Sequence, residues 1–255
     1  DIIRKLASKV DVLIENYKVG GLAKYGLDYS SLEKLNPKLV YCSITGFGQT
    51  GPYAQRPGYD FLIQGMAGLM SVTGEPDSQN GGGPTKVGVA VTDIFTGLYA
   101  ANAIQGALLE RHHSGIGQYI DLALLDVQAA VMANQASNYL IGGQIPGRLG
   151  NAHPNIVPYQ AFTTLDSHVI VAVGNDQQFQ RFCKAIGEPK WADDQRYATN
   201  TARVNNRVTL CGQITKHLKQ QTSQYWLSKF EDHAVPCGPI NTIDQVFDDP
   251  QIQSR

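Results

Sequence analysis

One carboxylate in the sequence stands where it could do chemistry. Asp93 follows an apolar, strand-like run over residues 87–91 and opens a long apolar segment with helical spacing. An aspartate there is most simply an N-cap, whose side chain accepts hydrogen bonds from the first backbone N–H groups of the helix. The same position suits catalysis, because a carboxylate at a helix N-terminus stays ionised and an ionised carboxylate is a usable nucleophile. The two interpretations are compatible.

Glycine-rich loops and one histidine are the other candidates. Gly46 and Gly48 begin a loop after an apolar strand, which is where sites in α/β sheets are usually built. The run at residues 81–83 suggests a phosphate-binding loop, but it lacks the Lys-Ser/Thr ending, and we interpret it as a flexible loop. His153, in a turn-rich stretch, is the one histidine that we consider a site candidate. No Ser-His-Asp or HExxH spacing is present.

Composition excludes several functional classes. The 255 residues are 42% hydrophobic, enough for one large domain or two smaller ones, and the net charge is −1 with scattered basic residues. Nucleic acid is therefore not an expected partner. No apolar run approaches the length of a membrane span, so no membrane association is expected. The four cysteines lie far apart without a CxxC pair, which argues against zinc or any other metal site and fits reduced thiols in the cytoplasm, or in mitochondria if the source is a eukaryote.

The elements around Asp93 predict an α/β layer. Residues 1–9 and 28–33 have helical spacing, whereas residues 10–14 and 39–45 are short apolar runs typical of buried parallel strands. Helix and strand alternating at this distance predict a parallel sheet. Loops at 46–58 and 73–88 flank a helix over 59–70. Asp93 then begins a helix that ends before Gly115, followed by a strand at 118–121 and a helix over 122–140.

The composition changes near residues 146–148, where a smaller unit begins. Residues 159–164 and 168–173 predict a hairpin around Asp166-Ser167. Amphipathic helices are expected over 175–186, 202–219 and 222–231, and residues 234–239 are expected to be extended. We therefore assign residues 1–147 to a large α/β domain and residues 148–240 to a linker and a small α+β domain.

Several strings, in register over nearly the whole chain, resemble the class III (CaiB/BaiF-type) coenzyme A transferases. The matching strings are residues 11–17 (DVLIENY), 21–27 (GLAKYGL), 41–48 (YCSITGFG), 58–60 (GYD), 92–94 (TDI) with Gly97, 117–121, 150–154 (GNAHP) and 235–240 (VPCGPI). Each string is weak alone, but together they identify the family.

The resemblance implies that Asp93 is the catalytic aspartate. It would attack a donor thioester to form a mixed anhydride, the CoA thiolate would form an aspartyl-CoA thioester, and an acceptor acid would reverse the sequence. Acyl-CoA is then a substrate, and no permanently bound cofactor is needed. Asn16, Tyr17 and Lys24 fall where relatives contact CoA. Backbone donors for oxyanions would come from two loops, residues 46–51 with Gly46 and Gly48, and residues 147–155 with Gly150, Asn151 and His153.

Two alternatives stay open. The family includes acyl-CoA racemases, which use a His-Asp pair with the histidine in a GHD string, but this chain has Tyr59 at that position. Tyrosine titrates near pH 10 and is a poor base at neutral pH, so Tyr59 is expected to line the acyl pocket or donate a hydrogen bond. The second alternative is a catalytically silent CoA-binding fragment.

Residues 41–60, 138–142 and 156–162 look most like succinyl-CoA:glutarate-type enzymes, which suggests a dicarboxylic substrate. Arg56 or Arg148 could then hold the distal carboxylate through paired hydrogen bonds. The family also implies a Rossmann-like large domain, a small domain, and a homodimer of two interlocked chains. Relative to that pattern the chain lacks segments at both ends, and residues 241–255 are expected to begin a return to the large domain.

Overall fold

Two three-stranded sheets organise the chain, one in each half. The structure, a computed structural model, describes residues 1–255. These divide into a first unit, residues 1–148, and a second unit, residues 149–255. The predicted change near residues 146–148 therefore falls close to this division.

The sheet of the first unit is parallel, as the sequence predicts. Its strands are β1 (Val12–Glu15), β2 (Val40–Thr45) and β3 (Tyr119–Ala123), in the order β1-β2-β3. Both pairings are parallel. Strand β2 is the central strand, and Val40, Tyr41 and Cys42 in it are almost completely buried.

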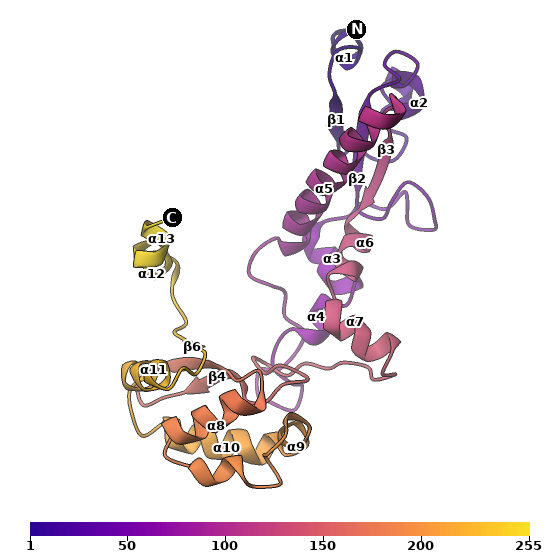
Figure 1. Cartoon of the computed structure of the whole chain (residues 1–255). Coiled ribbons are helices and arrows are strands. Elements are labelled where there is room, and N and C mark those ends of the chain that lie inside the picture. The colour runs from indigo at the N-terminus through magenta and orange to yellow at the C-terminus, as the bar shows by residue number, and fades with distance from the viewer. The chain divides into compact units, whose positions relative to one another are not determined.

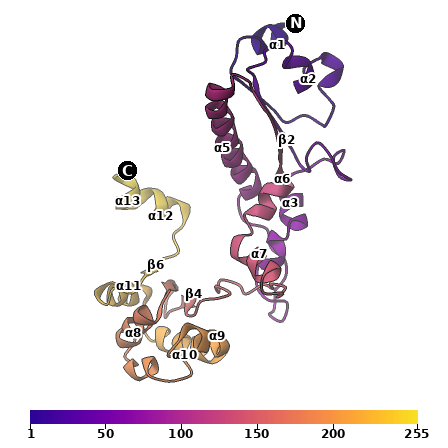
Figure 2. The same ribbon diagram turned by 45° about the vertical axis from the view of Figure 1, so that its right-hand side comes forward.

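Helix α5 is the longest element of this unit and packs against β2 and β3 (Figures 1 and 2). As predicted, it ends before Gly115. This glycine has a left-handed conformation (φ 73°), and its backbone N–H donates to the carbonyl of Arg111 in the last turn. The helices of the unit are α1 (Ile2–Ala7), η1 (Ala23–Tyr25), α2 (Tyr29–Leu32), α3 (Asp60–Met66), α4 (Leu69–Val72), α5 (Val91–Ser114), α6 (Leu124–Ala130) and α7 (Ala133–Leu140).

The start of α5 differs from the prediction. Residues 87–91 do not form a strand, and the helix begins at Val91 with Ala90 as its N-cap. Asp93 is therefore in the first turn, and its side chain caps nothing. The reason is that the backbone N–H of Val87 donates to the Gln64 side chain (2.9 Å) rather than to a neighbouring strand. Another carboxylate, described below, takes the capping role.

The predicted helix over 122–140 is two helices. Strand β3 extends to Ala123, and α6 and α7 are separated at Val131 and Met132. Ala133 follows with a positive φ of 44°, a conformation that helical periodicity alone does not reveal.

The second unit is built on an antiparallel sheet. Strands β4 (Tyr159–Thr163) and β5 (His168–Ala172) form the predicted hairpin, and β6 (Cys237–Gly238) pairs with β5. The helices are α8 (Asp176–Ala185), η2 (Pro189–Ala192), α9 (Asn200–Asn205), α10 (Arg207–Leu218), α11 (Ser223–Asp232), α12 (Ile243–Asp248) and α13 (Pro250–Gln253). The apolar faces of α8, α10 and α11 meet in one core that includes Phe182, Ile214 and Phe230.

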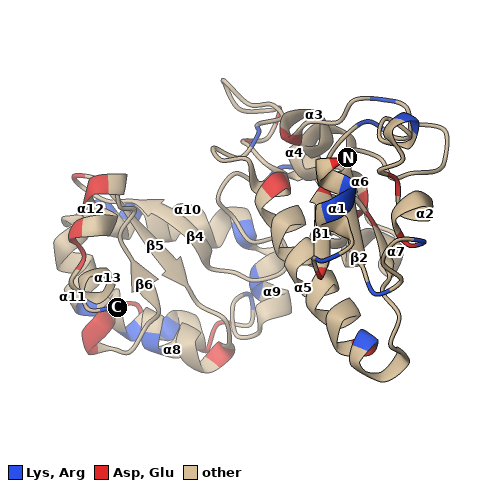
Figure 3. Ribbon diagram, turned by 90° about the horizontal axis from the view of Figure 1, so that it is seen from above, with Lys and Arg blue, Asp and Glu red and all other residues tan.

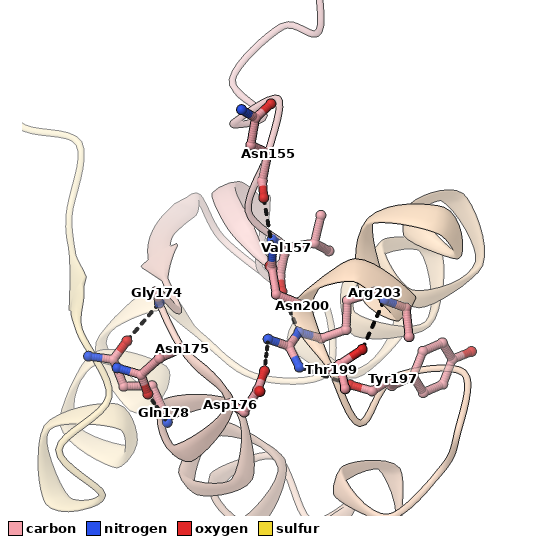
Figure 4. Close-up of polar contacts among 11 residues, drawn as sticks. Asn155, Val157, Gly174, Asn175, Asp176, Gln178, Tyr197, Thr199, Asn200 and Arg203 are labelled. Atoms are coloured by element: carbon pink, nitrogen blue, oxygen red, sulfur yellow. Dashed lines mark hydrogen bonds and ion pairs between the residues drawn. The ribbon is translucent and has the colours of Figure 1, made fainter. Parts of the chain in front are cut away.

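A fully buried arginine joins three segments of the second unit (Figure 4). Arg203 donates to the backbone carbonyls of Val157 (2.7 Å) and Tyr197 (2.9 Å) and to the Asp176 carboxylate (2.8 Å). Its guanidinium also lies 4.4 Å from the ring centre of Phe179. Buried charge is tolerated only when it is paired and hydrogen-bonded, and here these contacts meet that requirement.

Acidic and basic residues are interspersed along the ribbon of each unit (Figure 3), consistent with the net charge of −1. Each helix is too short or too polar to cross a bilayer. All four cysteines are unpaired, and Cys42 and Cys183 are buried.

Candidate functional site

Asp60 caps helix α5 from a neighbouring helix. Its Oδ1 accepts from the backbone N–H of Thr92 at 2.8 Å and from that of Asp93 at 3.4 Å. Its Oδ2 accepts from the Gln64 amide at 2.6 Å, one turn along α3. The orphan N–H groups of α5 are thus satisfied by another element, which frees the Asp93 side chain from capping.

Buried polar contacts fix the same helix start on two other sides. The fully buried Gln64 contacts the backbone of Val87 and Val89, and Thr92 Oγ1 donates to Gln128 of α6 at 2.7 Å. Because these groups are buried and hydrogen-bonded, the first turn of α5 is held in one place.

A close approach of two glycines positions the loop before α3. A methyl group built on Gly46 would lie 2.5 Å from the Cα of Gly58, and one on Gly58 would clash with Gly46 in turn. No larger residue fits at either position without backbone movement. This contact brings the end of β2 against Tyr59 and Asp60, and therefore against the start of α5.

These elements enclose a pocket of about 560 Å³ within the first unit. Asp93 lines it, together with Asn16 and Tyr17 after β1, Gly46 after β2, and Tyr59 before α3. The volume lies within the range of ligand-binding pockets. Six residues chosen from the sequence, these five and Arg56, thus meet in one cavity.

The environment of Asp93 raises its pKa above the ordinary value of an aspartate. Partial burial is the larger cause, and the nearby Asp60 carboxylate is the second. The N-terminus of α5 acts in the opposite sense, because it stabilises negative charge. A carboxylate with a raised pKa is more basic, and hence a better nucleophile when ionised, than an ordinary surface aspartate.

Two predicted residues lie outside the lining of this pocket. Lys24 is in η1, with its ammonium 4.9 Å from the ring centre of Tyr25. Gly48 has a positive φ of 86°, and its backbone N–H donates to Thr45 Oγ1 at 2.9 Å. That N–H is therefore engaged within the loop, whereas Gly46 reaches the cavity.

Gly150, Asn151 and His153 belong to the second unit, where they have local contacts of their own. The backbone N–H of His153 donates to Tyr159 O at 2.9 Å, and its Nδ1 accepts from the Asn155 backbone at 3.1 Å. Burial, and secondarily Arg207, lowers the pKa of the imidazole. Gly150 has a positive φ of 59°. Their assignment to the active site stays a prediction.

Sequence reasoning missed some residues of the site. Lys18, Thr96 and Gly97 line the pocket, and Asp60 and Gln64 support it. The pair Asp60/Gln64 has a readable signal, because a carboxylate and an amide four residues apart lie on one face of an otherwise apolar helix. Lys18 offers no signal that separates it from Lys24.

Comparisons with known proteins agree with this architecture. The family model for "CoA-transferase family III" matches residues 1–255. The chain belongs to that family. It is 58% identical over 254 residues to "Succinate--glutarate CoA-transferase" of Agrobacterium fabrum, covering 100% of this chain and 62% of that protein. It is 44% identical over 251 residues to "Succinyl-CoA:glutarate CoA-transferase" of Homo sapiens, covering 98% of this chain and 56% of that protein.

Solved structures of the family have the same fold. A CaiB/BaiF family protein from Brucella suis superposes with a TM-score of 0.83 at 53% identity, over 100% of this chain and 66% of that one. The predicted fold class is therefore confirmed as a family III CoA-transferase fold with a parallel sheet. The chain spans less than two thirds of the length of these relatives.

Proposed function

We propose that the protein to which this chain belongs transfers CoA from an acyl-CoA donor to a carboxylic acid, with Asp93 as the covalent nucleophile. The observation that carries the proposal is the position of Asp93. Its carboxylate is free of capping, has a raised pKa, and lines a ligand-sized pocket in a family III chain. No other carboxylate lines that pocket.

The reaction exchanges one thioester for another. An Asp93 carboxylate oxygen attacks the thioester carbonyl carbon, the C–S bond breaks, and a mixed anhydride and a CoA thiolate form. The thiolate attacks the aspartyl carbonyl, which releases the donor acid and leaves an aspartyl-CoA thioester. The acceptor carboxylate attacks that thioester, the C–S bond breaks, and a second mixed anhydride and a CoA thiolate form. The thiolate then attacks the acceptor acyl carbonyl, which gives the new acyl-CoA and releases the Asp93 carboxylate. The covalent intermediates divide one difficult exchange into easier steps, and the overall reaction is nearly thermoneutral.

Asp60 favours the acylated forms of Asp93 in this scheme. When Asp93 is ionised, two carboxylates face each other at the start of α5. Acylation removes the negative charge on Asp93, and with it the repulsion by Asp60. The same contact therefore destabilises the resting nucleophile and stabilises the intermediates relative to it.

Asn16, Tyr17 and Lys18 are proposed to bind CoA where β1 ends. They line the cavity with Asp93, and Lys18 supplies a point charge suited to phosphate. Lys24 stays a candidate through the family resemblance alone. Gly46, together with Gly150 and Asn151 of the second unit, is proposed to supply backbone donors to oxyanions. His153 stays a candidate through the family resemblance alone, because its backbone N–H already donates to Tyr159 O.

The names of the relatives support dicarboxylic substrates. The Agrobacterium and human relatives are both named for succinate or succinyl-CoA and glutarate. We therefore propose a succinyl-CoA-like donor and a dicarboxylic acceptor. The four unpaired cysteines support a reducing compartment, the cytoplasm or a eukaryotic mitochondrion. The interlocked homodimer and the absence of a resident cofactor rest on the family resemblance.

An exchange assay tests this function against the alternatives. Incubation with succinyl-CoA and glutarate is expected to yield glutaryl-CoA and succinate in the wild type and none in Asp93→Asn. A racemase would instead exchange the α-hydrogen of a 2-methylacyl-CoA with deuterium from the solvent. CoA binding with neither reaction would support the silent fragment. Because Tyr59 replaces the racemase histidine, we expect no deuterium incorporation.

A further inference from the structure

Arg56 lies in the same pocket as Asp93, on a loop between β2 and α3. Its guanidinium carbon is 4.6 Å from the ring centre of Tyr53 and 5.6 Å from that of Phe47. The two rings contact each other edge to face at 5.6 Å. Stacking on aromatic faces fixes the plane of a guanidinium and leaves the N–H donors at its edge available.

No acidic group of the protein uses those donors. The ion pairs of the structure engage Arg111, Arg148, Arg196 and Arg203, but not Arg56. Asp93 does not pair with Arg56 either, because none of the ion pairs joins these two side chains. The pocket therefore holds a nucleophilic carboxylate and a separate, unpaired arginine.

The other arginine considered from the sequence is already occupied. Arg148 pairs with Asp77 and donates to the carbonyls of Glu75 and Ser71. Its role is to hold the loop after α4, and it does not line the pocket. Of the two arginines, only Arg56 therefore has a guanidinium that is available to a substrate in the pocket.

We propose that Arg56 binds the distal carboxylate of a dicarboxylic acid whose other carboxyl group reacts at Asp93. The proposal rests on the proposed CoA transfer. A planar carboxylate fits the two parallel N–H donors of a guanidinium, and the aromatic support reduces the freedom lost on binding. Lys18, a flexible point charge in the same pocket, is the better match for a phosphate of CoA.

Paired acids of equal chain length test the assignment. Arg56→Ala is expected to raise the KM for glutarate by about tenfold to a hundredfold, because it removes a charge-assisted pair of hydrogen bonds. The same change should leave the KM for valerate, which lacks the second carboxylate, within about twofold. The KM for the donor should be determined with butyryl-CoA, whose acyl group lacks a distal carboxylate, and with valerate as acceptor, and it should not change.

Two further variants separate geometry from charge. Arg56→Lys keeps the charge but loses the planar fork, so it should restore glutarate use only in part. Tyr53→Phe keeps the ring and should bind glutarate normally, whereas Tyr53→Ala should weaken it in the same direction as Arg56→Ala. Arg196→Ala, which removes a surface arginine paired with Asp194, is the control for loss of one positive charge.

Equal losses for glutarate and valerate in Arg56→Ala would overturn the proposal. A rise only in the KM for butyryl-CoA would also overturn it, because it would place Arg56 at a phosphate of CoA. Titration of the free acids into the protein, with the heat of binding measured by calorimetry, tests carboxylate binding separately from turnover. A wild type without exchange activity would contradict the proposed function. Glutarate binding that is lost in Arg56→Ala would still support Arg56 as the carboxylate site, and unchanged binding would refute it.

Discussion

Asp60 and Asp93 are two carboxylates at one helix start with opposite tasks. Asp60 accepts hydrogen bonds from two backbone N–H groups at the start of α5 and stabilises the helix. Asp93 bears an unfavourable negative charge, which nucleophilic attack would remove. Functional sites commonly carry such local costs, and the surrounding structure maintains them.

Asp93→Asn should therefore stabilise the protein while it abolishes exchange. The pKa of Asp93 is raised by folding, so the folded state holds its proton more tightly than the unfolded state does, and the ionised form costs stability. The gain in Asp93→Asn should be complete above the folded-state pKa and vanish as the pH falls towards the ordinary value of 3.8. Thermal unfolding of both proteins between pH 7 and pH 4 measures this. A pH-independent difference would show that the charge of Asp93 does not destabilise the folded state.

Asp60→Ala should act in the other direction. Loss of the acceptor for two N–H groups of α5 is expected to cost about 1 kcal/mol of unfolding free energy, as for other helix caps. Asp60→Asn retains an acceptor oxygen and should cost less, while it removes the charge that raises the pKa of Asp93. The acidic limb of the pH–rate profile should then move to lower pH in Asp60→Asn. An unmoved limb would show that Asp60 has no electrostatic effect on Asp93.

At the scale of elements, periodicity predicted most helices and strands but not the interruptions. The parallel strands, the hairpin at 159–173 and the end of α5 follow from apolar runs, turn residues and Gly115. The start of α5 could not be predicted from local signals, because its cap comes from Asp60, about 30 residues earlier in the chain. The gathering of Asn16, Tyr17 and Gly46 at the site was predictable, since the carboxyl ends of parallel strands meet at one edge.

The choice between the two lysines depends on turn geometry that no pattern reveals. Lys18 lines the pocket and Lys24 does not, although only six positions separate them. Gly20 and Gly26, both with positive φ, turn the chain between and after them. Sequence periodicity predicts where helices and strands run, whereas the direction of a loop side chain depends on such individual backbone angles.

The contact between Gly46 and Gly58 is an element-scale test. Gly46→Ala should destabilise the first unit by about 1–3 kcal/mol, because the new methyl group meets backbone atoms that cannot move independently. Gly106→Ala is the matched control. Gly106 is an exposed glycine inside α5 with open space around its Cα, so alanine there should stabilise by about 0.5–1 kcal/mol. Denaturant unfolding compares the two, and equal effects would refute the packing argument.

At the scale of the whole molecule, the two units are stabilised by different interactions. The first unit depends on its parallel sheet and α5, and the second on the core around Phe182 and on Arg203. Arg203→Ala should destabilise the second unit by about 3 kcal/mol, because two buried carbonyls and the Asp176 carboxylate lose their partner.

Differential scanning calorimetry should show two unfolding transitions, one for each unit. Arg203→Ala is expected to lower the transition of the second unit alone, and Gly46→Ala that of the first alone. A single transition that shifts as one in both variants would show that the units unfold cooperatively. Each unit would then depend on the other for its stability.

The central claim is that Asp93 becomes covalently acylated. Mass spectrometry of the protein after incubation with succinyl-CoA and trapping with hydroxylamine tests it most directly, with Asp93→Ala as the control. A mass change is expected on the peptide that contains Asp93, and none is expected in the variant. An adduct on another residue, or turnover of succinyl-CoA to glutaryl-CoA that persists in Asp93→Ala, would contradict it.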